Sequence, residues 1–173
     1  MAKTLIAFFS RADENYFGGS MKYIEVGNTE VVVGKIKDHI DADVLKIEMK
    51  TPYAKDYNTC IEEAKAHKNQ NARPELVALP DSIDEYDTVI LGYPNYWGTM
   101  PMAVFTFLDA FDFSGKNILP LCTNEGSGMG SSESDIKRLC PGADVKKGLP
   151  IIGSGVANAD GQIENWLKSN GLM

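Results

Sequence analysis

Apolar runs alternate with segments of helical periodicity along the whole chain. Runs such as Val89-Ile90-Leu91 and Ile118-Leu119 are continuously apolar, as expected for strands that are covered by helices on both faces. Such strands are typical of parallel sheets. The pattern predicts strands at Thr4–Phe9, Val44–Glu48, Thr88–Tyr93, Asn117–Cys122 and Val145–Ile152.

The segments between these runs carry helix signals. In the first, Val32, Val33, Ile36 and Ile40 recur at helical spacing, and Asn28 or Thr29 can cap the helix. Strict alternation of strands and helices indicates βαβ units in one domain spanning residues 1–173, and an α/β doubly wound sheet. The predicted helices are Thr29–Ile40, a surface helix around Asn58–Asn71, Pro101–Phe111, Ser131–Leu139 and Ala159–Ser169.

Charge and composition narrow the classes of partner and compartment. The chain has 173 residues with 17 Lys and Arg against 24 Asp and Glu, a net charge of −7, so we expect no nucleic-acid partner. No apolar run approaches the roughly 20 residues of a membrane span, and the start MAKTLIAFF is too short for a signal sequence. We therefore expect a cytoplasmic protein with no membrane partner. Nothing in the sequence predicts its oligomeric state.

The three cysteines, Cys60, Cys122 and Cys140, are an odd number without metal-binding spacing to either histidine. We expect packed, reduced thiols and no metal site. We name no catalytic acid, base or nucleophile.

Three loops follow the first, third and fourth predicted strands, and right-handed crossovers place all three at the same edge of the sheet. Ligands of doubly wound sheets bind at this edge. The first loop joins Ser10-Arg11 to Asn28-Thr29 at a predicted helix start, where hydroxyls, a guanidinium and free N–H groups suit a phosphate monoester. The alternative is that these residues only end the strand and cap the helix.

The second loop, YPNYWGTMP, carries Tyr96 and Trp97 where protein can cover only one side of them. A planar ligand is predicted to cover the other, although the aromatics could instead close the core. The third loop, Thr123 to Gly130, is rich in glycine and hydrogen-bonding groups, and its place beside the other two makes it a candidate.

The first loop is unusually long. Strand-to-helix connections commonly take about two to six residues, but here Arg11 to Gly27 intervene. Gly18-Gly19 lies between short apolar-bearing flanks, and Met21 to Val26 alternates, which predicts a small hairpin. The hairpin is an excursion that leaves the phosphate site and returns to it, and it could cover a bound ligand or lie elsewhere on the surface.

In their order along the chain, FSR, GNTE, GYPNYWGTMP and LCTNEGSGMG resemble the motifs of flavodoxins. The resemblance covers nearly the whole chain. It implies a flavodoxin-like three-layer sandwich around a five-stranded parallel sheet of order 2-1-3-4-5, with noncovalent FMN. The short interval from Cys140 to Ala157 implies the short-chain topology, here with an insertion in the phosphate loop.

The resemblance also implies the roles of the loop residues toward FMN. Its phosphate would bind Ser10, Arg11, Asn28 and Thr29; Pro94, Asn95, Tyr96, Trp97 and Gly98 would line the isoalloxazine; Thr123, Asn124, Glu125, Gly126 and Gly128 would flank its other side.

Three functions remain open. The first is electron transfer through FMN between partner proteins, a reductase and an acceptor, with the acidic surface meeting positively charged partners. The second is an NAD(P)H-dependent reductase of small quinones or nitro compounds. The third is a flavin-free regulator on the same fold, but Gly92-Tyr93-Pro94 lacks a receiver's aspartate, and no cysteine precedes Cys60 as a tyrosine phosphatase requires.

Overall fold

The computed structural model describes residues 3–173. Its main sheet is parallel throughout, in the order β4-β1-β5-β6, with β7 and β8 both paired to the outer side of β6. The predicted order 2-1-3-4-5 is therefore confirmed, with β7 and β8 together as the fifth strand. The strands are β1 (Thr4–Phe8), β4 (Asp43–Lys46), β5 (Thr88–Pro94), β6 (Asn117–Asn124), β7 (Asp144–Val145) and β8 (Leu149–Ile152).

The fifth strand is interrupted, so the prediction of one continuous strand is wrong. Ile118 pairs with Val145 but Leu121 pairs with Leu149, which shifts the register by one residue. Three residues, 146–148, lie opposite Leu119 and Pro120, and proline has no N–H to donate to a ladder. The interruption covers only residues 146–148, in agreement with the expected short-chain topology.

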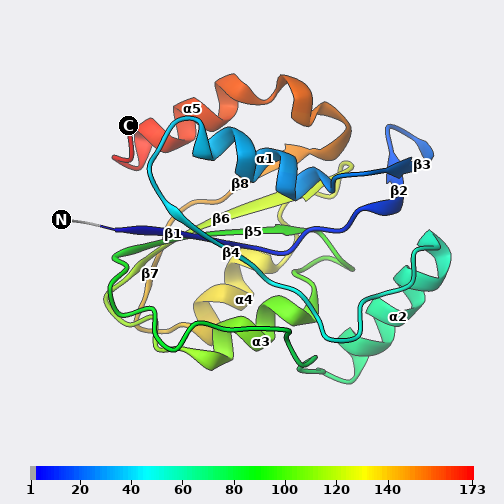
Figure 1. Cartoon of the computed structure of the whole chain (residues 1–173), viewed down its shortest axis with the longest axis horizontal. Helices are drawn as coiled ribbons and strands as arrows, with labels where there is room; N and C mark the ends of the chain where they lie inside the picture. The colour runs from blue at the N-terminus through cyan, green and yellow to red at the C-terminus, as the bar shows by residue number, and fades with distance from the viewer. Residues whose placement is uncertain (1–2) are drawn as a thin grey trace.

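Helices cover both faces of the sheet (Figure 1). Side chains alternate along β1, so Leu5 and Ala7 face the cluster that contains the α3 and α4 residues, while Ile6 and Phe8 face α1 and α5. In residues 3–173, every helix falls short of the length and apolar character of a transmembrane segment. The helices are α1 (Asn28–Lys37), α2 (Tyr57–Asn69), α3 (Met102–Ala110), α4 (Ser132–Leu139), α5 (Asp160–Ser169) and a 3₁₀ helix, Gly153–Asn158.

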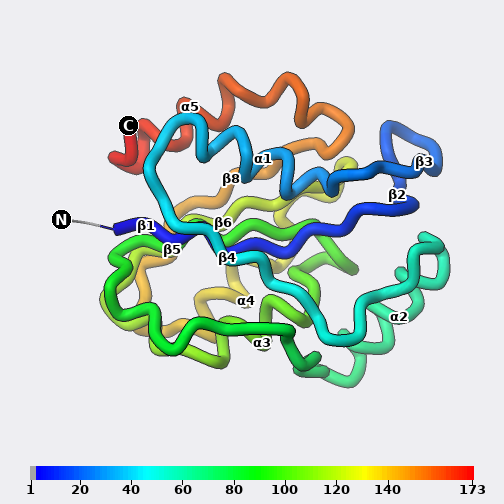
Figure 2. The backbone as a smooth tube through the Cα atoms, viewed as in Figure 1, coloured from blue at the N-terminus to red at the C-terminus, as the bar shows by residue number. Residues whose placement is uncertain are grey.

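The predicted hairpin is confirmed. Strands β2 (Asp13–Phe17) and β3 (Ser20–Ile24) pair antiparallel, and the turn between them uses Gly18 and Gly19 at φ of 63° and 95°. Positive φ at both turn residues favours glycine. The chain leaves β1, forms this hairpin and returns to α1, and the hairpin and α2 lie at the same end of the molecule (Figure 2).

The two ends of the excursion meet. A Cβ at Gly27 would lie 2.1 Å from Ser10 Oγ, so only glycine fits this approach. Ser10 Oγ accepts a hydrogen bond of 3.1 Å from the N–H of Glu30, in the first turn of α1. The predicted cap from Asn28 or Thr29 is wrong, because both residues lie inside the helix and Gly27 is the N-cap residue. The capping hydroxyl instead belongs to Ser10, which precedes the hairpin in sequence.

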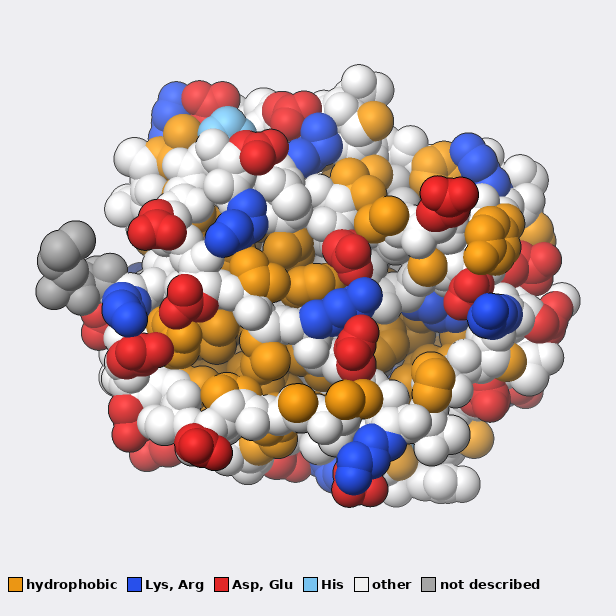
Figure 3. Space-filling view, in the orientation of Figure 1, with side chains coloured by type: hydrophobic (Ala, Val, Ile, Leu, Met, Phe, Trp, Pro, Cys, Tyr) orange, Lys and Arg blue, Asp and Glu red, His pale blue; other side chains and the backbone are white. Residues whose placement is uncertain are grey.

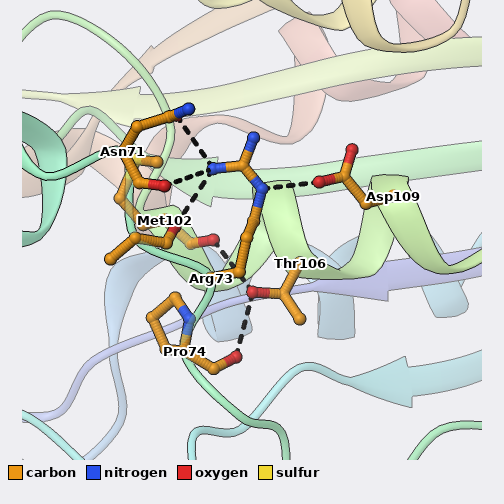
Figure 4. Close-up of polar contacts among 7 residues, drawn as sticks. Asn71, Arg73, Pro74, Met102, Thr106 and Asp109 are labelled. Atoms are coloured by element: carbon orange, nitrogen blue, oxygen red, sulfur yellow. Dashed lines mark hydrogen bonds and ion pairs between the residues drawn. The ribbon is translucent and has the colours of Figure 1, made fainter.

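A loop after α2 is fixed to α3 (Figure 4). Arg73 Nε donates to the carboxylate of Asp109 at 2.5 Å, and the Thr106 hydroxyl donates to the Pro74 carbonyl at 2.9 Å. The Arg73 guanidinium also lies 5.3 Å from the centre of the Phe105 ring. These contacts anchor the long return from α2 to β5.

The surface near edge strand β4 mixes apolar and charged side chains. On the face in Figure 3, hydrophobic side chains reach the surface among acidic and basic ones. Val44 is 45% exposed, and Lys46 forms ion pairs with Glu30 at 2.8 Å and with Glu48 at 3.6 Å. Charged side chains of this kind protect an edge strand against pairing with another chain.

We predict that Ser10→Ala destabilises the protein, because the N–H of Glu30 loses its acceptor. The free energy of unfolding should fall by about 1 kcal/mol, as for other N-cap losses. Denaturant unfolding followed by circular dichroism measures the change. Ser20→Ala on the exposed hairpin is the matched control, and equal stability of the two variants would contradict the capping role.

Candidate functional site

A cavity of about 390 Å³ opens at the carboxyl edge of the sheet, where the three predicted loops meet. Its volume lies within the usual range of small-molecule sites, about 300–1,000 Å³. The walls come from the first loop and its hairpin, from α2 and from the loops after β5 and β6. The lining residues are Arg11, Asn15, Tyr16, Asn28, Tyr57, Cys60, Ile61, Ala64, Pro94, Asn95, Tyr96, Trp97, Gly98, Thr123, Asn124, Glu125, Ser127 and Gly153.

The start of α1 forms one part of the cavity wall. In residues 3–173, the backbone N–H groups of Asn28 and Thr29 have no hydrogen-bond partner, while that of Glu30 is bonded to Ser10. The Thr29 hydroxyl is buried and lies 2.8 Å from that of Thr123. This contact joins α1 to β6. The N–H groups of Asn28 and Thr29 lie at the positive end of the helix dipole, which suits an anion.

Gly153 leaves space for two polar side chains at this part of the cavity. A Cβ at Gly153 would lie 2.4 Å from Asn28 Nδ2 and 3.1 Å from Glu125 Oε1. The carboxylate of Glu125 accepts hydrogen bonds from the Ser154 N–H at 3.0 Å and the Ser154 hydroxyl at 3.1 Å. Glu125 therefore ties the third loop to the 3₁₀ helix.

The loop after β5 is held in shape by its own amide side chain. Asn95 Oδ1 accepts from the Gly98 N–H, and Asn95 Nδ2 donates to the Gly128 carbonyl, both at 2.9 Å. Trp97 and Gly98 both have positive φ, 56° and 84°. The Gly98 carbonyl also accepts from the Ser131 N–H at 2.7 Å, so the second and third loops form one rigid wall.

The two aromatics of that loop pack differently. Tyr96 packs against Phe9 and Tyr53, with ring centres 5.9 Å and 6.2 Å apart. Trp97 is 42% exposed, and its indole N–H donates to the Ile61 carbonyl on α2 at 2.8 Å. Both aromatics line the cavity while also contacting protein on another side.

Glycines and an asparagine shape the third loop. Gly126 and Gly128 have φ of 125° and 67°, which disfavours larger residues. The side chain of Asn124 is buried and accepts a hydrogen bond of 2.9 Å from the Gly126 N–H. This hydrogen bond and these dihedral angles together define the shape of the loop.

Arg11 lies in the cavity wall, but its donors are directed to protein. The guanidinium donates to the carbonyl oxygens of Glu14, Ala54 and Lys55, with distances of 2.9 Å and 2.7 Å for the last two. These carbonyls belong to the hairpin and to the segment before α2.

The cavity brings most of the predicted site residues together. Ser10 and Thr29 lie behind the wall at the start of α1, and Gly126 and Gly128 shape the third loop without lining the cavity. The predicted residues that line the cavity are Arg11, Asn28, Pro94, Asn95, Tyr96, Trp97, Gly98, Thr123, Asn124 and Glu125.

Sequence analysis did not select the α2 and hairpin residues that line the cavity. One face of α2 lines the cavity through Tyr57, Cys60, Ile61 and Ala64, which recur at helical spacing. This spacing indicates a covered face, although we expected the helix to lie on the surface. Of the other lining residues, Asn15 and Tyr16 belong to β2, Gly153 begins the 3₁₀ helix, and Ser127 lies in the third loop that we named as a candidate without selecting this residue.

Burial changes the titration of groups in and near the cavity. It raises the pKa of the Cys60 thiol, an effect that the nearby Arg11 charge partly opposes. It also raises the pKa of the Tyr96 hydroxyl well above its usual value. Burial raises the pKa of Cys122 to about 12 and that of Cys140 to about 11. All three cysteines are free and buried, as predicted.

Comparison with known proteins identifies a family. The model of the family described as Flavodoxin matches residues 17–170. No curated protein sequence matches the chain.

Solved structures share the fold across the whole chain. A putative flavoprotein from Bacteroides eggerthii superposes with a TM-score of 0.80 at 24% identity, covering 100% of both chains. A putative flavoprotein from Bacteroides uniformis superposes with a TM-score of 0.75 at 23% identity, covering 96% of this chain and 98% of that chain. A flavoprotein from Lactobacillus acidophilus in complex with FMN superposes with a TM-score of 0.64 at 19% identity, covering 91% of this chain and 98% of that chain.

We predict that alkylation of Cys60 is slow at neutral pH and accelerates as the pH rises. The thiolate is the reactive form, and because burial raises the pKa of this thiol, its thiolate fraction is small at neutral pH and grows with pH. Peptide mass spectrometry after iodoacetamide treatment across about pH 7 to 10 measures the profile. Cys122 and Cys140 should remain unmodified until the protein unfolds. Alkylation of Cys60 at the rate of free cysteine at neutral pH would contradict the structure.

Proposed function

This chain belongs to the flavodoxin family, and on that premise we propose that it transfers electrons through a noncovalently bound FMN. The observation that carries the proposal is that the start of α1, through Asn28, and the aromatic loop after β5 line one cavity at the carboxyl edge of the sheet. When bound, FMN supplies the redox chemistry, and the protein supplies binding, orientation and electrostatics.

We assign the phosphate of FMN to the start of α1. The unpaired N–H groups of Asn28 and Thr29 and the amide of Asn28 are donors that suit a phosphate. Gly153 leaves the space that the Asn28 amide occupies. Ser10 contributes by holding the helix start in place through Glu30.

We assign the ring system to the rigid wall formed by the second and third loops. Pro94 to Gly98 supply aromatic and backbone surface, and Thr123 to Glu125 supply polar groups beside it. Two hydrogen bonds from Ser154 bind the Glu125 carboxylate, and they would offset part of the electrostatic cost of this negative charge near a reduced, electron-rich ring. The net charge of −7 favours positively charged redox partners.

A second candidate is a reductase that takes electrons directly from NAD(P)H and passes them to a small quinone or nitro compound. The observation that favours it is the contribution of Tyr16 and Tyr57 to the cavity from the hairpin and α2. Aromatic side chains there offer a surface on which a small planar molecule can pack.

We predict that FMN binds tightly and that riboflavin, which lacks the phosphate, binds more weakly, because the helix start provides the phosphate donors. Quenching of flavin fluorescence on titration with the apoprotein measures both affinities. Since Cys60 lines the cavity, bound FMN should also slow its alkylation. Absence of quenching by either flavin would reject the proposal.

For the carrier, we predict that NADPH or NADH alone leaves the visible absorption of the FMN-loaded protein unchanged under anaerobic conditions, while dithionite bleaches it. A reductase would instead be bleached by one of the nicotinamides, and a quinone would restore the colour. Stopped-flow absorbance distinguishes the two candidates.

A further inference from the structure

Arg11 joins two segments that are far apart in sequence. Its half-buried guanidinium donates to the carbonyl of Glu14 in β2 and to those of Ala54 and Lys55, which precede α2. In residues 3–173, it forms no ion pair with a carboxylate. A planar group with several donors can hold carbonyls of two segments at once.

Glu14 reinforces this junction from the other side. Its carboxylate accepts a hydrogen bond of 2.9 Å from the N–H of Tyr57, the first residue of α2, and its own N–H donates to the Lys55 carbonyl at 3.3 Å. Asp56 is the N-cap residue of α2, and its side chain accepts a hydrogen bond of 2.8 Å from the N–H of Thr59 in the first turn. The helix start is therefore partly capped by the hairpin.

The joined segments present a continuous set of side chains to the cavity. Asn15 and Tyr16 come from β2, and Tyr57, Cys60 and Ile61 come from α2. These side chains are mainly aromatic or apolar, which suits a planar ring better than a phosphate. We call these two segments, residues 13–17 and 54–64, the hairpin–α2 wall.

We propose that Arg11 is a positioning residue, which fixes the hairpin–α2 wall against the ring system of FMN and does not serve as the partner of its phosphate. This inference rests on the proposed function, since it assigns the wall to the same cofactor. It gives the long insertion after Ser10 a role, because the hairpin supplies both Tyr16 and the Glu14 contacts to α2.

The position of the Arg11 charge supports this assignment. The charge of Arg11 opposes the rise in pKa that burial causes at Cys60, Tyr57 and Tyr96. These three residues lie where the aromatic loop and α2 meet. The phosphate donors, by contrast, belong to Asn28 and Thr29, where Gly153 and Glu125 form the wall.

The test compares the affinities of FMN and riboflavin for the wild type and for Arg11→Lys, Glu14→Ala and Asn28→Ala. Arg11→Lys keeps the charge but loses the planar set of donors, so both affinities should fall together, by about tenfold, with their ratio unchanged. Glu14→Ala should act in the same way. Asn28→Ala should weaken FMN alone and so reduce the ratio.

The absorption spectrum of bound FMN provides a second readout, because its band shape reports the surroundings of the ring. It should change in Arg11→Lys and Glu14→Ala and remain unchanged in Asn28→Ala at saturation. Arg138→Lys, an exposed arginine on α4, is the matched control and should leave affinities and spectrum unchanged.

Two results would overturn the inference. One is a loss of FMN affinity in Arg11→Lys with riboflavin binding unchanged, which would make Arg11 a phosphate partner. The other is unchanged binding of both flavins in a folded Arg11→Lys and Glu14→Ala. Failure of the wild type to bind either flavin would instead reject the proposed function itself.

Discussion

The parallel direction of β1, β5 and β6 is the constraint on which the site depends. Because all three strands run the same way, the loops that follow them emerge at one edge, and residues more than eighty positions apart share a cavity. The buried contact between the hydroxyls of Thr29 and Thr123 joins the start of α1 directly to β6 at this edge. The ladder of the sheet thus fixes the relative positions of groups that no local interaction could align.

The insertion in the first loop is compatible with this constraint because its ends meet. The hairpin pairs its own strands, and Ser10 and Gly27 approach so closely that Gly27 has no space for a side chain. A serine before the hairpin consequently caps the helix that follows it. Insertions that return to their origin leave the underlying helix start intact and add new surface beside it.

The hairpin also holds the start of α2 in place. Arg11 donates to the carbonyls of Ala54 and Lys55 just before α2, and the Tyr57 N–H donates to the carboxylate of Glu14 in β2. One face of α2 lines the cavity. The second loop meets the same helix through the indole of Trp97. The cavity is thus bounded by the loops after β5 and β6 and by the hairpin–α2 wall.

The sequence by itself determined the order of strands and helices, the Gly18-Gly19 hairpin and the three loops at the carboxyl edge, because these follow from short-range periodicity and turn chemistry. Tertiary structure alone decided the break at residues 146–148, the cap from Ser10, the direction of the Arg11 donors and the place of α2 in the cavity wall. Each of these depends on contacts between segments distant in sequence. Local patterns do not encode the distance or direction of such contacts, which packing and hydrogen-bond satisfaction fix only when the chain is folded.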